Sequence, residues 1–115
     1  MAMSIDSKYI DVDSALSRVG GNIDLFKRLL GKFETSFDMD QFNHAIASQD
    51  YKQASEIVHA VKGIAGNLSL MSFFEISSIL MDQLRGGNAP EHEKVEIFRD
   101  SYIKTLAAIK SYLAQ

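Results

Sequence analysis

The chain has 115 residues and a mass of 12.8 kDa, a size that fits one compact domain and leaves no room for a second. Its composition, 46% hydrophobic and 23% charged, is typical of a globular protein and not of a disordered or membrane-spanning chain. The absence of cysteine excludes disulfide scaffolds and thiolate metal sites, and a formal net charge of −3 without a basic cluster argues against nucleic-acid binding.

The N-terminus contains no basic region followed by an apolar run, and no segment approaches about 18 apolar residues. We therefore expect a cytoplasmic protein without a membrane segment, and we expect it to be a monomer. Because the first predicted helix begins at about Asp11, residues 1–10 are expected to form a poorly ordered N-terminal segment. Residues 11–115 are expected to form a single helical domain.

Apolar residues recur at spacings of three and four along the whole chain, which predicts helices, and no segment alternates as a strand does. The first short helix is predicted from Asp11, with Asp11 or Asp13 as its N-cap, to Gly20-Gly21, where a left-handed residue can end it. A second helix is predicted from about Ile23. The rest of its apolar stripe consists of Phe26, Leu30, Phe33 and Phe37.

Asp38 or Asp40 can cap a continuation of the second helix to about Ser48, and Asp50 then opens a third, long helix. The apolar stripe of the third helix consists of Ala54, Ile57, Val58, Val61, Ala65 and Leu68. A break over residues 69–72 follows this stripe.

The fourth predicted helix ends at Gly86-Gly87, and its apolar residues are Phe73, Ile76, Ile79, Leu80 and Leu84. The only proline, Pro90, suits the first turn of a last helix. The stripe of that helix consists of Val95, Phe98, Tyr102, Leu106, Ile109 and Leu113. Four substantial amphipathic helices predict an all-α fold, an antiparallel four-helix bundle with the short first helix lying across one end.

The predicted third helix has an unusual polar face. On a helical wheel at about 100° per residue, with Ile57 at zero, its apolar stripe covers an arc of about 100° that faces the core. Four residues share the opposite face, at about 140° to 240°: Lys62, Gly66, His59 and Gly63. The imidazole of His59 is therefore expected to point to solvent.

Two glycines on an exposed helix face are unexpected, because each costs about 1 kcal/mol relative to alanine. Without side chains, Gly63 and Gly66 are expected to leave a shallow depression beside His59, where another backbone or a phosphoryl group can approach. Lys62 adds a mobile positive charge three residues from His59. This pattern favours a surface imidazole that carries phosphate.

The segment HAVKGIAGNL, residues 59–68, resembles the HxxKGxAxNL signature of histidine-containing phosphotransfer (HPt) domains. The upstream run ALSRVGGNIDLFKRLLGKF, residues 15–33, also resembles the opening of that family. The number of predicted helices and the chain length also fit that family, so the resemblance extends over about residues 11–114.

The resemblance implies that His59 is a phosphoacceptor in a phosphorelay of two-component signal transduction. It takes a phosphoryl group from an aspartate of one receiver domain and passes it to an aspartate of another. Lys62 would balance the phosphoryl charge, Gly63 would allow close docking, and Gly66 and Asn67 would shape the adjacent surface. The partners would be receiver domains of response regulators and of hybrid sensor kinases.

Such a carrier needs no cofactor or metal of its own, because Mg²⁺ is expected on the partner receiver domain. The chain has no ATP-binding motif, so we expect a phosphoprotein that is not an enzyme. A neutral imidazole is sufficient for the chemistry, and an exposed histidine has a pKa of about 6.5.

The sequence departs from the family pattern at two places. Many members have glycine after the Asn-Leu pair, where this chain has Ser69. Members also commonly have Glu or Gln on the neighbouring helix, level with the histidine. Reflecting His59 through a turn near residue 70 or 71 leads to Met81 and Asp82, with Asp82 or Gln83 as possible substitutes for the missing polar group.

Two other interpretations stay open. One is a helical bundle that binds a receiver or a kinase without accepting phosphate. The other is a metalloprotein, since Glu56 and His59 have the ExxH spacing of di-iron bundles; however, the motif occurs once and His59 is expected to face outward. His44 and His92 are expected to be solvated side chains.

Overall fold

The structure is a computed structural model that describes residues 8–115, and this part of the chain is helical with no strand. Its helices are α1 (Val12–Arg18), α2 (Ile23–Ser36), α3 (Met39–Ala47), α4 (Tyr51–Asn67), α5 (Met71–Leu84) and α6 (His92–Leu113), with a short 3-10 turn, η1 (Arg85–Gly87), after α5. The predicted all-α class is confirmed. No helix in residues 8–115 combines the length and apolar character that crossing a bilayer requires.

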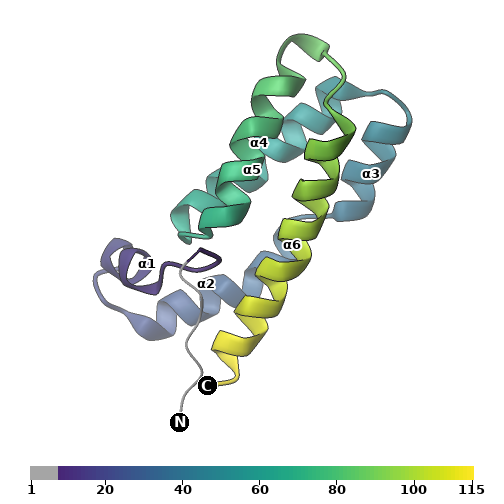
Figure 1. The fold of residues 1–115 in the computed structure, drawn as a ribbon. Helices are drawn as coiled ribbons and strands as arrows, with labels where there is room; N and C mark the ends of the chain where they lie inside the picture. Colours follow the sequence, from purple (N-terminus) through teal and green to yellow (C-terminus); the bar gives the residue numbers. More distant parts are fainter. Residues whose placement is uncertain (1–7) are drawn as a thin grey trace.

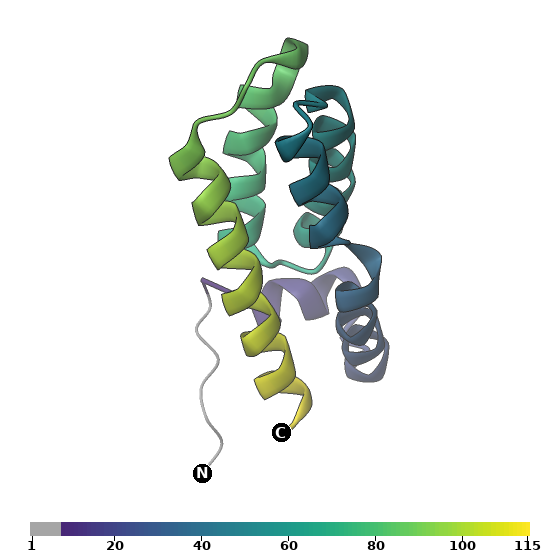
Figure 2. The same cartoon turned by 90° about the vertical axis from the view of Figure 1, so that its right-hand side faces the viewer.

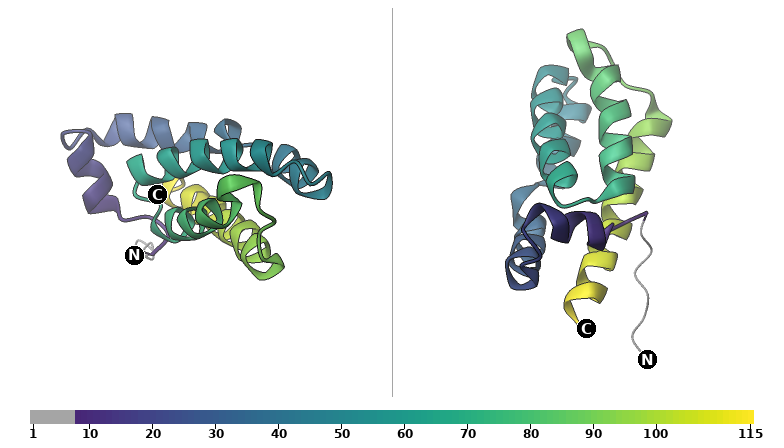
Figure 3. Two further views of the ribbon diagram at one scale, coloured as in Figure 1. Left: turned by 90° about the horizontal axis from the view of Figure 1, so that it is seen from above. Right: turned by 90° about the vertical axis from the view of Figure 1, so that its left-hand side faces the viewer.

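The helices form an elongated arrangement in which α3, α4, α5 and the first half of α6 lie side by side (Figure 1). α2 lies beside the second half of α6, and α1 lies across the end of the group, next to the turn between α4 and α5 (Figure 2). Figure 3 shows the same crossing of α1 from the other side. This arrangement leaves one side of α4 uncovered by any other helix.

Aspartate side chains define three of the helix starts. Asp11 accepts a hydrogen bond from the backbone N–H of Ser14 at 3.2 Å, and Asp38 accepts one from Asp40 at 2.9 Å. Asp50 caps α4 in the same way. Of the predicted alternatives, Asp11 and Asp38 are therefore the N-caps, each satisfying a backbone N–H that has no partner within the helix.

The last helix begins two residues later than the sequence predicted, because Pro90 precedes it and Glu91 is its N-cap. The start of α6 is held not by the proline but by the side chain of Gln83, near the end of α5. Its side-chain oxygen accepts from the backbone N–H of Glu91 at 2.9 Å, and its amide nitrogen donates to the Glu91 carboxylate at 2.7 Å. The first turn of α6 is thus fixed by a side chain from the preceding helix.

The core is built around aromatic rings at the break between α2 and α3. Phe37 lies in this break with an extended backbone, and its ring centroid is 5.0 Å from Tyr102, 5.8 Å from Phe98 and 6.1 Å from Phe73. Burial raises the pKa of the Tyr102 phenol, and the nearby carboxylates of Glu34 and Asp38 raise it further. Other fully buried large side chains are Phe26, Leu30, Phe33, Phe42, Leu70, Leu80 and Leu84.

The packed structure begins before Asp11. The backbone N–H of Ser72 donates to the carbonyl of Lys8 at 2.7 Å, and that of Asp11 donates to the carbonyl of Ser69 at 2.9 Å. Ile10 is 1% exposed and belongs to the core. Residues 8–10 are therefore ordered against the α4–α5 turn, contrary to the expectation for residues 1–10, of which residues 1–7 lie outside the described part of the chain.

The backbone conformation at Ser69, after α4, is one that glycine adopts without strain. Its φ is +55°, in the left-handed region, and the N–H of Leu70 donates to the carbonyl of Ala65 at 2.9 Å, as in a Schellman C-cap. Ser69 is 2% exposed, and its hydroxyl donates to the Ser14 hydroxyl at 3.2 Å. The serine side chain thus connects this turn to α1.

The two left-handed residues that are not glycine give a matched stability test. Gln49, after α3, has φ +60° and an exposed side chain that makes no hydrogen bond in the described structure. We expect Gln49→Gly to raise the free energy of unfolding by about 1 kcal/mol, because it relieves the left-handed strain. Ser69→Gly should change it by less than about 0.5 kcal/mol, because the lost hydroxyl bond offsets that gain.

Urea denaturation of both variants checks this difference. Equal stabilisation by the two substitutions would show that the bond between Ser69 and Ser14 contributes nothing to stability.

Candidate functional site

His59 lies on the uncovered side of α4 and is exposed, as the wheel predicted. The buried residues of α4 are Ala54, Val58, Val61 and Ala65. Ile57, at one edge of the predicted buried stripe, is only half-buried, so the buried face of the helix is shifted slightly toward Val58. On the wheel these buried residues span about 40° to 100°, so His59 lies about 130° from the centre of the buried face.

The surroundings of the His59 imidazole are open. Within residues 8–115 no side chain forms a hydrogen bond or ion pair with it. Gly63, one turn further along α4, is exposed, and a Cβ atom added there would meet nothing within 4 Å. One side of the ring is therefore accessible to a large partner at close range.

Gly66 has a different role from the one predicted. A Cβ atom at this position would lie 3.1 Å from Cε1 and 3.3 Å from Cδ1 of Phe74, a half-buried residue of α5. The ring of Phe74 occupies the space above Gly66. The prediction of a depression at Gly66 is therefore wrong. This glycine instead allows α4 to pack closely against α5.

Lys62 lies at the border between α4 and α5 and is half-buried. Its Nζ is 5.8 Å from the centroid of the Phe74 ring, a cation–π distance. No carboxylate among the described residues pairs with this ammonium. Lys62 therefore has a charge available for an anion on the same helix as His59, three residues away.

The structure changes the predicted pairing across α4 and α5. The Sδ of Met81 accepts a hydrogen bond from the hydroxyl of Ser55 at 3.7 Å, so Met81 lies level with Ser55, one turn before His59. Together with the contact between Gly66 and Phe74, this register places Ser78 level with His59. The Ser78 hydroxyl donates to the Phe74 carbonyl at 3.0 Å.

The two proposed substitutes are occupied elsewhere. Asp82 is exposed and forms an ion pair of 3.2 Å with Arg85. Gln83 caps α6 through Glu91, as described above. The reflection through residue 70 or 71 was wrong by about one turn, because residues 68–70 form a C-cap before α5 begins.

Asn67 and Gly66 lie on different flanks of α4. Gly66 faces α5, whereas Asn67 lines an apolar cleft of about 270 Å³ between α2 and α4. Leu29, Phe33, Ile64 and Leu68 supply most of the apolar lining of this cleft. This cleft could not be predicted from the periodicity, because it depends on how α2 and α4 pack in the tertiary structure.

The two residues of the ExxH pair lie on the surface of α4. No group of three or more His, Asp or Glu side chains in residues 8–115 is placed to hold a metal ion. Glu56 and His59 are both exposed. His44 is exposed as well, and Nε2 of His92 lies 4.0 Å from the Glu96 carboxylate on the surface of α6.

Comparison of the chain with protein-family models, with curated proteins and with solved structures finds no match. The candidate site therefore depends on the geometry of α4 and α5 and on the resemblance of residues 59–68. Its central residues are His59, Lys62 and Gly63.

The two glycines should respond differently to alanine. Gly63→Ala should raise the free energy of unfolding by about 1 kcal/mol, because the added methyl group meets no atom and favours the helix. Gly66→Ala should give a smaller gain or a loss, because the Phe74 ring must move to admit it.

Chemical denaturation measures both changes. Equal gains would show that Phe74 does not constrain Gly66. The substitution Gly66→Ala in a Phe74→Leu background provides the control, since removing the ring should restore the full gain.

Proposed function

We propose that this protein is an HPt-type phosphorelay intermediate, with His59 as its phosphoacceptor. The observation that carries the proposal is an exposed imidazole in the middle of α4, on its uncovered side, with open space at Gly63 beside it. The finer arrangement that goes with this function is an antiparallel four-helix bundle formed by α3, α4, α5 and α6. In such a bundle α4 presents the histidine to a partner.

The transfer step needs only an accessible ring nitrogen. That nitrogen attacks the phosphorus of a receiver's aspartyl phosphate; the N–P bond forms as the P–O bond to the aspartate breaks, and the aspartate leaves as a carboxylate. Transfer to the next receiver reverses this sequence on a second aspartate. Positioning and Mg²⁺ come from the receiver, so this chain supplies the nucleophile and the docking surface.

Lys62 and Gly63 support this step in different ways. The ammonium of Lys62, which has no ion pair in the described chain and lies over the Phe74 ring, is three residues from His59 on α4 and can balance the phosphoryl charge. Gly63 lets the receiver's backbone approach the ring without meeting a side chain. The receiver domains of response regulators and hybrid kinases are the proposed partners, in the cytoplasm.

A second candidate is a bundle that binds receivers without accepting phosphate. The observation that favours it is the lack of a partner for the imidazole, since Ser78 stands level with His59 and donates to a backbone carbonyl instead. In that case His59 is a surface residue of the docking face and has no chemical role.

The phosphotransfer assay separates these candidates. Incubating the protein with phosphorylated receiver domains should give an acid-labile label on the wild type and none on His59→Gln. His92→Gln is the matched control, because His92 is also exposed on a helix surface but lies on α6. Receiver binding by wild type and His59→Gln alike, without label on either, would favour the binding module.

A second test concerns docking. Gly63→Gln should slow phosphoryl transfer at least about tenfold by crowding the face beside His59, while its circular dichroism matches wild type and its unfolding temperature is equal to or above that of wild type. Gly31→Gln is the matched control: Gly31 is an exposed helical glycine of α2, with open space around it. Equal transfer rates for wild type and folded Gly63→Gln would contradict the docking role of Gly63.

A further inference from the structure

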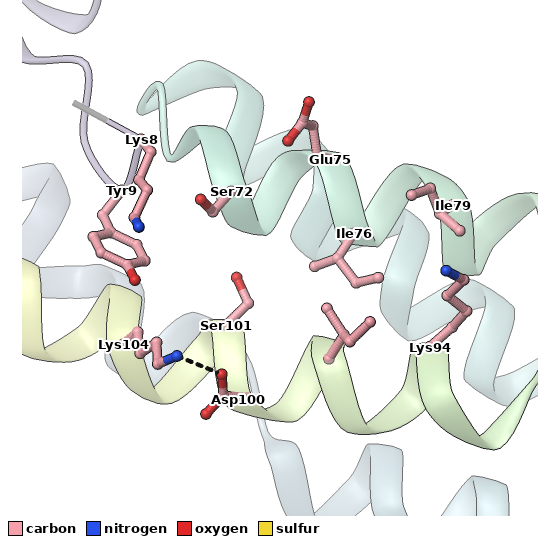
Figure 4. A pocket seen from close by; sticks show the side chains of 11 residues that line it. Lys8, Tyr9, Ser72, Glu75, Ile76, Ile79, Lys94, Asp100, Ser101 and Lys104 are labelled. Carbon is pink, nitrogen blue, oxygen red and sulfur yellow. Dashed lines mark ion pairs between the residues drawn. The ribbon is translucent and has the colours of Figure 1, made fainter. Parts of the chain in front are cut away.

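A second cleft, of about 330 Å³, lies between α5 and α6, and no residue of α4 lines it (Figure 4). Its apolar floor is formed by Ile76, Ile79 and Ile97. Ile79 and Ile97 are 44% and 41% exposed, which is unusual for large aliphatic side chains. The cleft is separate from the His59 face, because its α5 residues lie on the side of that helix away from Phe74, which contacts α4.

Polar groups gather at one end of this cleft. Tyr9, Ser72, Ser101 and Lys104 come together there from the N-terminal turn, α5 and α6 (Figure 4). The hydroxyl of Ser101 points from α6 across the cleft toward Ser72. Hydroxyl donors beside an ammonium form the kind of group that receives a carboxylate.

Ser101 is the most informative residue of this group. It is 8% exposed, and its hydroxyl has no hydrogen-bond partner among the described residues. A buried hydroxyl without a partner opposes folding, and at the wall of a cleft a bound ligand can satisfy it. Ser77, on α5, has a similar buried hydroxyl without a partner, but it does not line the cleft.

Charged side chains of both signs line the cleft. Lys8, Lys94 and Lys104 line it, against two carboxylates. Asp100 pairs with Lys104 at 2.9 Å, and its hydrogen bond and charge raise the pKa of Lys104. Glu75 points away from α6 (Figure 4). Lys94 has no ion pair within residues 8–115, and it lies at the other end of the cleft, beside Ile79 (Figure 4).

We propose that the cleft between α5 and α6 binds a small amphipathic carboxylate. The head group accepts hydrogen bonds from the hydroxyls of Ser101 and Tyr9 and lies near Lys104. The hydrocarbon part follows the isoleucines toward Ile79, which is seven residues from Ser72 on α5, or about 10.5 Å along the helix axis. A medium-length alkyl chain covers this floor. The site is independent of phosphoryl transfer at His59.

The experiment is a titration of the ¹⁵N-labelled protein with sodium octanoate, followed by amide chemical shifts. We expect saturable shifts at the cleft, for example at Ser72, Ile97 and Ser101, and little change at His59. Octanol should bind at least about tenfold more weakly, because it lacks the charged acceptor. Shifts that do not saturate, that centre on the cleft between α2 and α4, or that octanol reproduces at equal concentration would overturn the proposal.

Two serine variants separate binding from folding. Ser101→Ala should weaken octanoate binding about tenfold while its unfolding temperature stays equal to or above that of wild type, because an unsatisfied hydroxyl is removed. Ser77→Ala, the matched control, should also keep or raise the unfolding temperature but leave octanoate affinity unchanged. Equal affinity of wild type and Ser101→Ala would refute the role of Ser101 in binding.

Discussion

The packing of aromatic rings at Phe37 is the interaction on which the arrangement of the helices depends. Phe37 lies between α2 and α3, and its ring contacts Phe73 from α5 and both Phe98 and Tyr102 from α6. Burying this ring requires the chain to leave the helical conformation at residue 37, which separates α3 from α2. α3 then lies beside α4, while α2 lies beside the second half of α6.

The same core sets the rotation of α4, which decides what its surface presents. Val58, Val61 and Ala65 are buried, so the opposite residues must face solvent or a neighbouring helix edge. Gly63 and His59 face solvent, whereas Gly66 and Lys62 meet α5 at Phe74. The glycines of one short motif thus have two physical functions: one keeps a surface open and the other allows two helices to approach.

In both proposed sites a polar side chain forms no hydrogen bond within the described chain. His59 has no intramolecular partner within the described chain, and the buried hydroxyl of Ser101 has none either. Only the Ser101 hydroxyl is buried, and a buried polar group without a partner calls for an explanation such as a bound molecule. For His59 the proposed partner is a receiver domain, and for Ser101 it is a small carboxylate. The two sites share no residue and are separated by the body of α5.

The sequence by itself determined the helical class, most of the helix starts and the exposure of His59, because apolar periodicity and capping residues act within a few positions along the chain. It placed Phe37 on the stripe of a continuing helix, whereas the structure breaks the helix there. It did not determine the start of α6, which depends on Gln83 reaching Glu91, or the register that pairs Met81 with Ser55. The contact of Phe74 with Gly66 and the cleft between α5 and α6 likewise came only from the tertiary structure. These features depend on how far apart two packed helices lie and which residues stand level, and side-chain volumes in the shared core set both.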